Sequence, residues 1–288
     1  MIVLEGAPNF RDLGGIACDG GRAIRPGRIY RSDVLSRLTA ADLSRIASVS
    51  LDVRLVCDLR SPEERMNESN RWPRGRGVQT VVRDIDEDMG SLKPNYWTTC
   101  FLDPEFDGVV ARKAMIHAYR TMPTAFARPL AALFAHLEQQ DGGAALIHCV
   151  AGKDRTGFVC AMLLWALGAP MASILDDYRL SAENFARTGR LEELLSGLFG
   201  DEVPARAKGA AAVIGAVRGE YLEAAFDEIG LEFGSIDGYL AGAAGLTPER
   251  RAQLKKHLLI DPQKSSFPTK LGGSGCRIVS APAGTERR

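Results

Sequence analysis

The feature that most constrains this chain is a polar segment, 147–157, set between two strongly apolar runs. The residues just before it, 144–146, are apolar, and the run into Cys149 is short enough for a buried strand. The residues after it, 158–165, are apolar nearly all round and predict a buried helix. We therefore expect a tight turn that leads from a core strand into the N-terminus of a core helix.

Such a turn favours binding of an anion. Backbone N–H groups at a helix start point at one place, where the helix dipole adds about half a positive charge. Gly152 lacks a Cβ and lets the backbone curl close to a ligand. In this field Cys149 should ionise more readily than a free thiol, because positive surroundings favour the thiolate. Arg155 can hold two oxygens of the same tetrahedral anion.

The order His148-Cys149, five further residues and then Arg155-Thr156-Gly157 resembles the phosphate-binding loop of the cysteine-dependent protein tyrosine phosphatase superfamily. The fuller form, with Ala151-Gly152-Lys153-Asp154, is similar to the bacterial atypical tyrosine and phosphoinositide phosphatases of the triple-specificity type. Other segments match the opening block, the second block and, more weakly, the C-terminal part of that family: 9–15, 30–32, 56–65 and 236–240. The resemblance spans residues 6–260, with gaps.

The resemblance implies hydrolysis of phosphate monoesters through a phosphocysteine intermediate, without a metal or other cofactor. The expected substrates are phosphotyrosyl proteins or phosphoinositides, and the sequence does not decide between them. Cys149 is the expected nucleophile, His148 supports the loop from behind, and Thr156 donates a hydrogen bond to the sulfur. The residues expected to bind phosphate are Val150, Ala151, Gly152, Lys153, Asp154, Arg155, Thr156 and, outside the loop, Arg60.

The general acid for the leaving oxygen is expected among several carboxylates. Asp154 lies in the loop and contributes to the site in the resembled family. Asp58 follows a predicted buried strand, 53–57, and ligands gather at the carboxyl ends of parallel strands. The alternative is structural, with Asp58 capping the turn 61–65 or pairing with an arginine. Loop carboxylates elsewhere are further candidates: Asp84, Asp86, Glu87, Asp88 and Asp103.

Other chemistries compete for the loop. A nucleotide-binding P-loop needs Gly-x4-Gly-Lys-Ser/Thr, but Ile147 and Asp154 occupy its first and last positions. A buried core thiol is a common role for a cysteine, but it does not explain why 153–155 is charged between two core elements. A phosphate-binding pseudophosphatase and a rhodanese-like sulfurtransferase remain as alternatives.

Charge and composition limit the partners. The 288 residues contain 36 Lys and Arg against 36 Asp and Glu, so no overall field attracts nucleic acid or a membrane surface. We find neither a membrane-spanning apolar run nor a signal peptide. The six cysteines show no metal-site spacing. We expect a cytoplasmic protein without an obligate protein partner, although secretion without a signal peptide stays open.

The expected fold is a single α/β domain over residues 1–261, with a central, mostly parallel sheet flanked by helices on both faces, and a disordered tail at 262–288. Segment 29–31 is expected to be an edge strand. Helices over 109–122 and 125–139, split at Pro123, resemble the pair that covers the pocket in the family, so 105–140 is the expected helical lid.

Overall fold

The computed structural model describes residues 2–49, 51–73, 77–82 and 96–261. Its centre is a five-stranded sheet in the order β1-β3-β6-β4-β5. The strands are β1 (Arg11–Asp12), β3 (Ile29–Ser32), β4 (Val53–Asp58), β5 (Gln79–Val82) and β6 (Ala144–His148). The pairs β3–β6, β6–β4 and β4–β5 are parallel and β1–β3 is antiparallel, which confirms the mostly parallel sheet. Strands β2 (Ala23–Ile24) and β7 (Leu259–Ile260) form a separate antiparallel pair.

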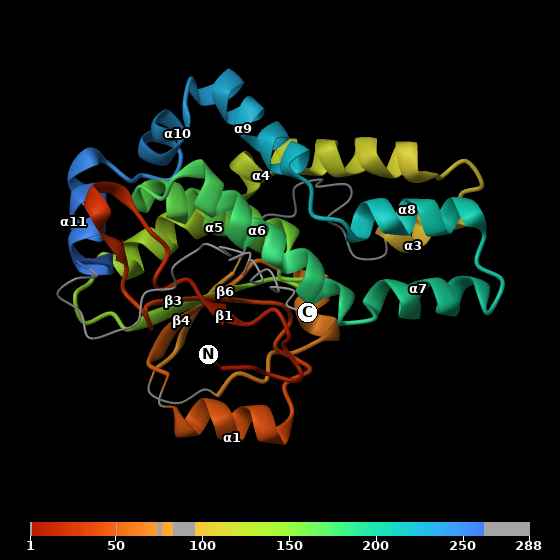
Figure 1. Cartoon of the computed structure of the whole chain (residues 1–288), viewed down its shortest axis with the longest axis horizontal. Helices are drawn as coiled ribbons and strands as arrows, with labels where there is room; N and C mark the ends of the chain where they lie inside the picture. Colours follow the sequence, from red (N-terminus) through yellow and green to blue (C-terminus); the bar gives the residue numbers. More distant parts are fainter. Residues whose placement is uncertain (1, 50, 74–76, 83–95, 262–288) are drawn as a thin grey trace, which may run out of the picture.

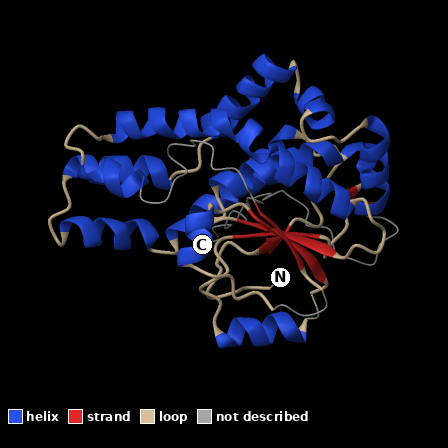
Figure 2. Cartoon of the chain, turned by 180° about the vertical axis from the view of Figure 1, so that it is seen from behind, coloured by secondary structure: helices blue, strands red, loops and turns tan. Residues whose placement is uncertain are grey.

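Helices flank this sheet on both faces, as predicted (Figures 1 and 2). Helix α1 lies on one side, and α4, α5 and α6 lie on the other. The helices are η1 (Asp19–Gly21), α1 (Ala40–Ser48), α2 (Pro62–Asn67), α3 (Tyr96–Leu102), α4 (Gly108–Leu137), α5 (Asp154–Leu167), α6 (Met171–Ala186), α7 (Arg190–Phe199), α8 (Ala205–Gly215), α9 (Gly219–Phe233), α10 (Ile236–Gly242) and α11 (Pro248–Leu258). Among the described residues, no helix is long and apolar enough to cross a membrane.

Strand β6 and helix α5 form the centre of the core, as their apolar sequences predict. Every residue of β6 is buried, because parallel strands lie along both its edges and helices cover both faces of the sheet. Helix α5 buries all its residues except Asp154 and Trp165. It ends at Gly168, whose φ of 85° suits glycine at a helix C-terminus. The polar loop between β6 and α5 is thus held by two rigid elements.

Two expectations about secondary structure were wrong. Segment 29–31 is not an edge strand, since β3 lies between β1 and β6. The predicted break at Pro123 does not occur, and α4 is one helix with Pro123 and Pro129 inside it. An interior proline removes a helical hydrogen bond and costs about 3 kcal/mol. Helix α4 buries fourteen residues, both prolines included, and this tertiary packing outweighs the local penalty.

A group of helices extends beyond the sheet. Helices α3, α7 and α8 pack with the N-terminal part of α4 around a separate apolar cluster (Figure 1). Its buried members include Phe101, Phe106, Leu195 and Ile214. Most of segment 200–218, whose state the sequence did not predict, is helix α8 in this group. The predicted disordered tail, 262–288, lies outside the described residues.

Candidate active site

Three strand ends meet at one edge of the sheet. His148, the last residue of β6, is in register with Ser32 at the end of β3 and with Asp58 at the end of β4. The strand that ends at Asp58 and the strand that leads into Cys149 are therefore neighbours. This is the arrangement in which both residues could face one ligand site at the carboxyl ends of the strands. The chain continues from this edge into the Cys149 loop, so the loop lies at the carboxyl ends of parallel strands, where α/β sheets bind ligands.

Gly152 sets the path of the Cys149 loop. Its φ is +64°, in the left-handed region that favours glycine. A Cβ at this position would lie 2.5 Å from the Ser32 carbonyl oxygen and 2.6 Å from the Asp33 nitrogen. The neighbouring Val150 carbonyl accepts a hydrogen bond from the Val34 N–H at 3.0 Å. The loop is therefore packed directly against the backbone that follows β3.

Side chains from distant segments hold the loop carbonyls from behind. The Asn9 amide donates to the carbonyls of Ala151, at 3.1 Å, and Gly152, at 2.9 Å. Arg31 Nη2 donates to the same Gly152 carbonyl at 2.8 Å. Because the carbonyls point backward into these donors, the loop amides are free to face the other side.

Asp177 of α6 fixes the arginines of this support. It accepts from Arg11 Nε at 2.8 Å and from Arg31 Nη1 at 2.5 Å, and both arginines also donate to Ser181. Burial alone would raise the pKa of Asp177, but the two guanidinium groups lower it below its usual value. Arg11 is therefore an internal structural group.

The N-terminus of α5 lacks a side-chain cap. Lys153 is the N-cap residue and makes no capping hydrogen bond, and the Lys153 carbonyl accepts the first helical bond from Gly157 at 2.8 Å. The first N–H groups of a helix have no partner within it. Unpartnered N–H groups at a helix start are the feature that an anion site of the kind expected from the sequence requires.

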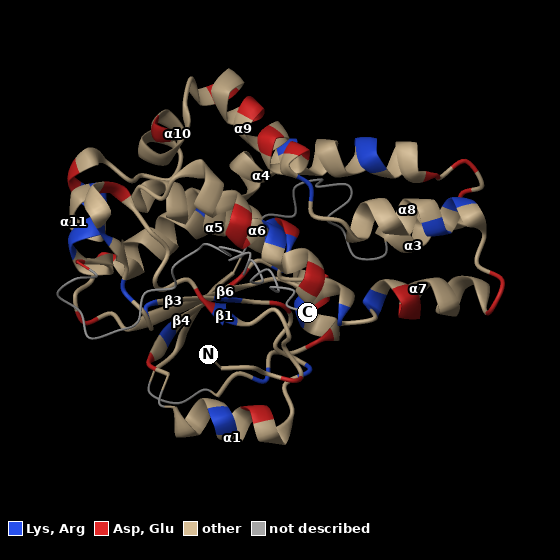
Figure 3. Ribbon diagram, viewed as in Figure 1, with Lys and Arg blue, Asp and Glu red and all other residues tan. Residues whose placement is uncertain are grey.

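Cys149 opens into a cavity of about 230 Å³. The thiol is a free cysteine and is 2% exposed. The cavity is lined by Glu64, Trp97, Cys149, Val150, Ala151, Lys153, Asp154, Arg155, Phe185, Arg190, Leu191, Leu194 and Ile214. Three of these residues are cationic and two are acidic, so the cavity is locally positive in a chain of zero net charge. Over the described helices as a whole, Lys and Arg are interspersed with Asp and Glu (Figure 3).

Arg155 is brought to the cavity together with a partner that the sequence did not assign. Its Nη1 and Nη2 donate to the two Glu64 carboxylate oxygens at 2.6 and 2.8 Å. Glu64 also accepts from the Ser61 N–H, in a capping box that starts α2. Burial alone would lower the pKa of Arg155, but Glu64 and Cys149 raise it. In the sequence, the Ser61-x-x-Glu64 pattern predicts a helix start. It does not predict that Glu64 pairs with Arg155.

Lys153 and Asp154 lie close to each other, but their hydrogen bonds go to different elements. The Lys153 ammonium is buried, donates to the carbonyls of Ile214 and Ala216, and lies 5.0 Å from the centre of the Phe185 ring. It is also 3.5 Å from Asp154 Oδ2. The other carboxylate oxygen, Oδ1, accepts a hydrogen bond from Tyr119 of α4 at 2.8 Å. Tyr119 thus fixes the orientation of a carboxylate at the cavity wall.

The two supporting residues differ in their contacts. The Thr156 hydroxyl is buried and has no hydrogen-bond partner among the described residues. His148 lies behind the loop, with Nδ1 3.2 Å from the Cys149 carbonyl and Nε2 3.2 Å from the Asn70 amide. Burial lowers the pKa of His148. In this position His148 orients the backbone and does not line the cavity.

Asp58 and Arg60 pair with each other and do not reach the Cys149 cavity. Arg60 donates to both oxygens of Asp58, at 2.9 and 2.8 Å, and Asn70 donates to the same carboxylate at 3.0 Å. Both residues are 1% exposed and line a different cavity, of about 460 Å³. Burial raises the pKa of Asp58, but His148 and Arg60 outweigh burial and bring it to about 2. This geometry matches the structural alternative.

The remaining acid candidates are placed as follows. Asp84, Asp86, Glu87 and Asp88 lie outside the described residues. Asp103 is exposed just after α3, where its carboxylate accepts from the Glu105 N–H at 2.9 Å, and it does not line the Cys149 cavity. Asp154 is the aspartate that lines this cavity in the part of the chain that the structure describes.

The helical cover over the cavity differs from the predicted lid. No residue of 105–140 lines the cavity among the described positions. The helical lining comes from Trp97 of α3, Phe185 of α6, α7 and Ile214 of α8. Helix α4 packs its apolar surface into the core, while long-range packing places α7 and α8 at the cavity. Within the described segments, no three His, Cys, Asp or Glu side chains gather as a metal site would require.

Comparison with known proteins agrees with this geometry. The sequence model of a tyrosine phosphatase family matches residues 2–260. The Cupriavidus necator protein H16_A0669, whose name assigns it provisionally to the tyrosine-protein phosphatases, is 34% identical over 90% of this chain and 88% of its own. The triple specificity protein phosphatase PtpB of Mycobacterium tuberculosis is 33% identical over 83% of this chain and 92% of its own.

Proposed function

Because this chain belongs to the tyrosine phosphatase family and is a phosphoric monoester hydrolase, we propose that Cys149 is its nucleophile and that the 149–156 loop binds the phosphate. The observation that carries the proposal is the convergence of three groups on one cavity. They are the Cys149 thiol, the uncapped N-terminus of α5 and the Arg155 guanidinium held by Glu64. This set matches what transfer of a phosphoryl group requires: a nucleophile and fixed positive groups around the equatorial oxygens.

The first displacement forms a covalent intermediate. The Cys149 thiolate attacks phosphorus, the bond from phosphorus to the ester oxygen breaks, and a phosphocysteine results. Loop amides and Arg155 hold the three equatorial oxygens. Glu64 occupies both Nη groups of Arg155, and Nε makes no hydrogen bond to any described residue. The edge of the guanidinium that carries Nε is therefore available to donate a hydrogen bond to a phosphate oxygen.

Asp154 supplies the proton in this mechanism. Its carboxylic acid protonates the leaving oxygen in the first step, and its carboxylate accepts a proton from the attacking water in the second. Water then attacks phosphorus, the sulfur–phosphorus bond breaks and inorganic phosphate leaves. The Thr156 hydroxyl, which has no hydrogen-bond partner in the described part of the chain, is proposed to stabilise the departing thiolate.

The proposed substrates are phosphotyrosyl proteins and phosphoinositides. Support comes from the family, from a relative named for triple specificity, and from the local surplus of Lys153, Arg155 and Arg190 at the cavity. Several cations suit a head group with more than one phosphate. A panel of phosphotyrosyl, phosphoseryl and phosphoinositide substrates, ranked by kcat/KM, tests this specificity.

The nucleophile is tested by turnover of p-nitrophenyl phosphate. We expect wild type to hydrolyse it, Cys149→Ser to be inactive while still binding phosphate, and vanadate to inhibit. Equal rates for the two proteins would exclude Cys149 as nucleophile. A pseudophosphatase would bind phosphate without any turnover, and a rhodanese-like enzyme would form thiocyanate from thiosulfate and cyanide.

A further inference from the structure

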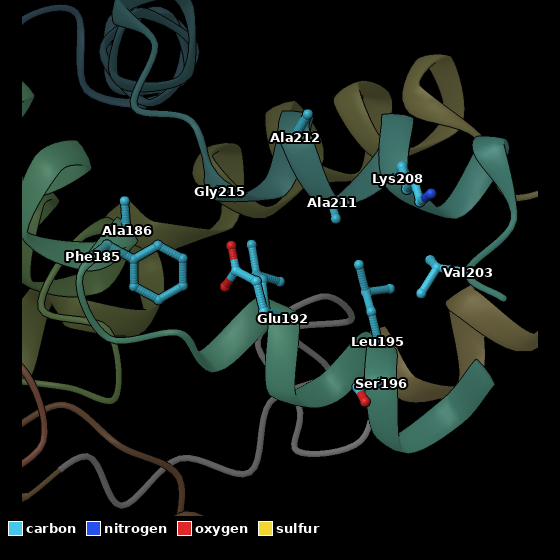
Figure 4. A pocket seen from close by; sticks show the side chains of 11 residues that line it. Phe185, Ala186, Glu192, Leu195, Ser196, Val203, Lys208, Ala211, Ala212 and Gly215 are labelled. Carbon is cyan, nitrogen blue, oxygen red and sulfur yellow. The ribbon is translucent and has the colours of Figure 1, made fainter. Parts of the chain in front are cut away.

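A second cavity lies beside the Cys149 cavity, between α7 and α8 (Figure 4). Its volume is about 540 Å³, within the range of small-molecule pockets. It is lined by Phe185, Ala186, Leu191, Glu192, Leu195, Ser196, Val203, Lys208, Ala211, Ala212 and Gly215. Most of these side chains are apolar. The polar ones, Glu192, Ser196 and Lys208, are exposed.

The two cavities share part of their walls. Phe185 and Leu191 line both of them, and Ile214 of the catalytic cavity directly precedes Gly215 of the second. The Lys153 ammonium lies over the Phe185 ring. One ligand can therefore place an anionic group among Lys153 and Arg155 and extend past Phe185 into apolar surroundings.

We propose that the α7–α8 cavity binds an aliphatic chain attached to the phosphate that Cys149 attacks. The inference rests on the proposed function, and it names an amphiphilic phosphate monoester as a substrate class. The paired cavities match such a molecule, with cations on one side of the shared wall and hydrocarbon on the other.

The lining distinguishes an aliphatic chain from a peptide. An extended peptide carries N–H and C=O groups that need partners when buried. The lining here comes mainly from α7 and α8, whose backbone groups are largely used within the helices, and its polar side chains are exposed. A hydrocarbon chain needs no hydrogen bonds and gains free energy for each methylene removed from water.

The test uses n-alkylphosphonates, from ethyl to octyl, as competitive inhibitors of p-nitrophenyl phosphate hydrolysis at concentrations below micelle formation. These compounds have no leaving group, so the series varies only the chain. We expect the inhibition constant to fall by about tenfold or more from ethyl- to octylphosphonate. A fully buried methylene contributes about a fourfold gain, so burial of only two of the six added methylenes gives this change. Constants that do not change with chain length would overturn the proposal.

Two matched variants locate the effect. Ala212→Trp places a large side chain at an exposed position of α8 that lines the cavity, and it should abolish the dependence on chain length. Ala205→Trp changes an exposed position of the same helix outside the lining, and it should keep the wild-type dependence. An unchanged dependence in Ala212→Trp would exclude this cavity as the chain site.

This design separates the two hypotheses. If p-nitrophenyl phosphate is not hydrolysed, the proposed function fails. If it is hydrolysed and ethylphosphonate inhibits, but longer chains bind no better, only the chain site fails. A third result would instead assign the cavity to a peptide. In that case apolar residues beside phosphotyrosine would raise kcat/KM for phosphotyrosyl peptides, while longer alkylphosphonates would inhibit no better than ethylphosphonate.

Discussion

The guanidinium of Arg155 lies against the carboxylate of Glu64, with Nη1 2.6 Å from Oε2 and Nη2 2.8 Å from Oε1. Glu64 is in turn tied to the start of α2 by the Ser61 capping box. The orientation of the Arg155 guanidinium at the cavity is therefore set by Glu64. Because both groups are largely buried, loss of either partner would leave the other as a buried charge without compensation.

Glu64→Gln should lower kcat because the guanidinium loses its fixed position. We expect a decrease of about 10- to 100-fold, the scale seen when a reacting group is displaced by an ångström. Steady-state turnover of p-nitrophenyl phosphate measures it. Glu63→Gln, on an exposed position of the same helix, is the control and should retain wild-type kcat. Wild-type kcat in Glu64→Gln would show that Arg155 is positioned without this contact.

Asp154→Asn should reveal the general acid through its dependence on the leaving group. Loss of an acid costs about 100-fold or more for a poor leaving group such as phenol, and much less for p-nitrophenol. The ratio of kcat for the two aryl phosphates is the measurement. Asp103→Asn changes an exposed candidate outside the cavity and should leave the ratio unaltered. A uniform loss on both substrates in Asp154→Asn would assign Asp154 to binding.

Asp58 should contribute to stability with a definite pH dependence. The pKa of its carboxyl is about 2 in the fold against 3.8 for an ordinary aspartate. A lowered pKa means that the contribution is complete above pH 3.8 and is lost as pH falls through 2. The shift corresponds to about 2 kcal/mol of unfolding free energy.

Asp58→Asn tests this assignment by denaturant unfolding at several pH values. It leaves Arg60 buried without its counter-charge, so we expect a loss of about 3–5 kcal/mol near neutral pH. The difference from wild type should narrow as pH falls from 4 to 2. The ratio of kcat for good and poor leaving groups should stay as in wild type. A selective loss on poor leaving groups would make Asp58 the acid after all.

Gly152→Ala should disrupt the Cys149 loop and, with it, the proposed binding of phosphate. The added Cβ meets the Ser32 carbonyl and the Asp33 nitrogen, so the loop must move away from β3. We expect phosphate binding and turnover to fall by about 100-fold, because the amides lose their convergence. Gly20→Ala is the matched control, with φ of +69° and no atom within 4 Å of the added carbon. It should cost about 1 kcal/mol of stability and no activity. Full turnover in Gly152→Ala would show that the loop tolerates this movement.

The sequence by itself determined the strand, the loop and the helix that carry Cys149 and Arg155. These elements are contiguous, and their apolar patterns and glycine are local properties that need no knowledge of the rest of the fold. The mostly parallel sheet was predicted for a similar reason, because short apolar strands alternate with longer helical segments.

Tertiary structure alone decided what surrounds the loop. Glu64 meets Arg155 across 91 residues, Arg31 meets Gly152 across 121, and Arg11 meets Asp177 across 166. The same is true of Asp58, which lies at the predicted strand end but pairs with Arg60 and does not line the Cys149 cavity. The cover by α7 and α8 in place of 105–140 likewise depends on how distant apolar surfaces pack. Such contacts depend on strand register and side-chain direction, which no local pattern of residues encodes.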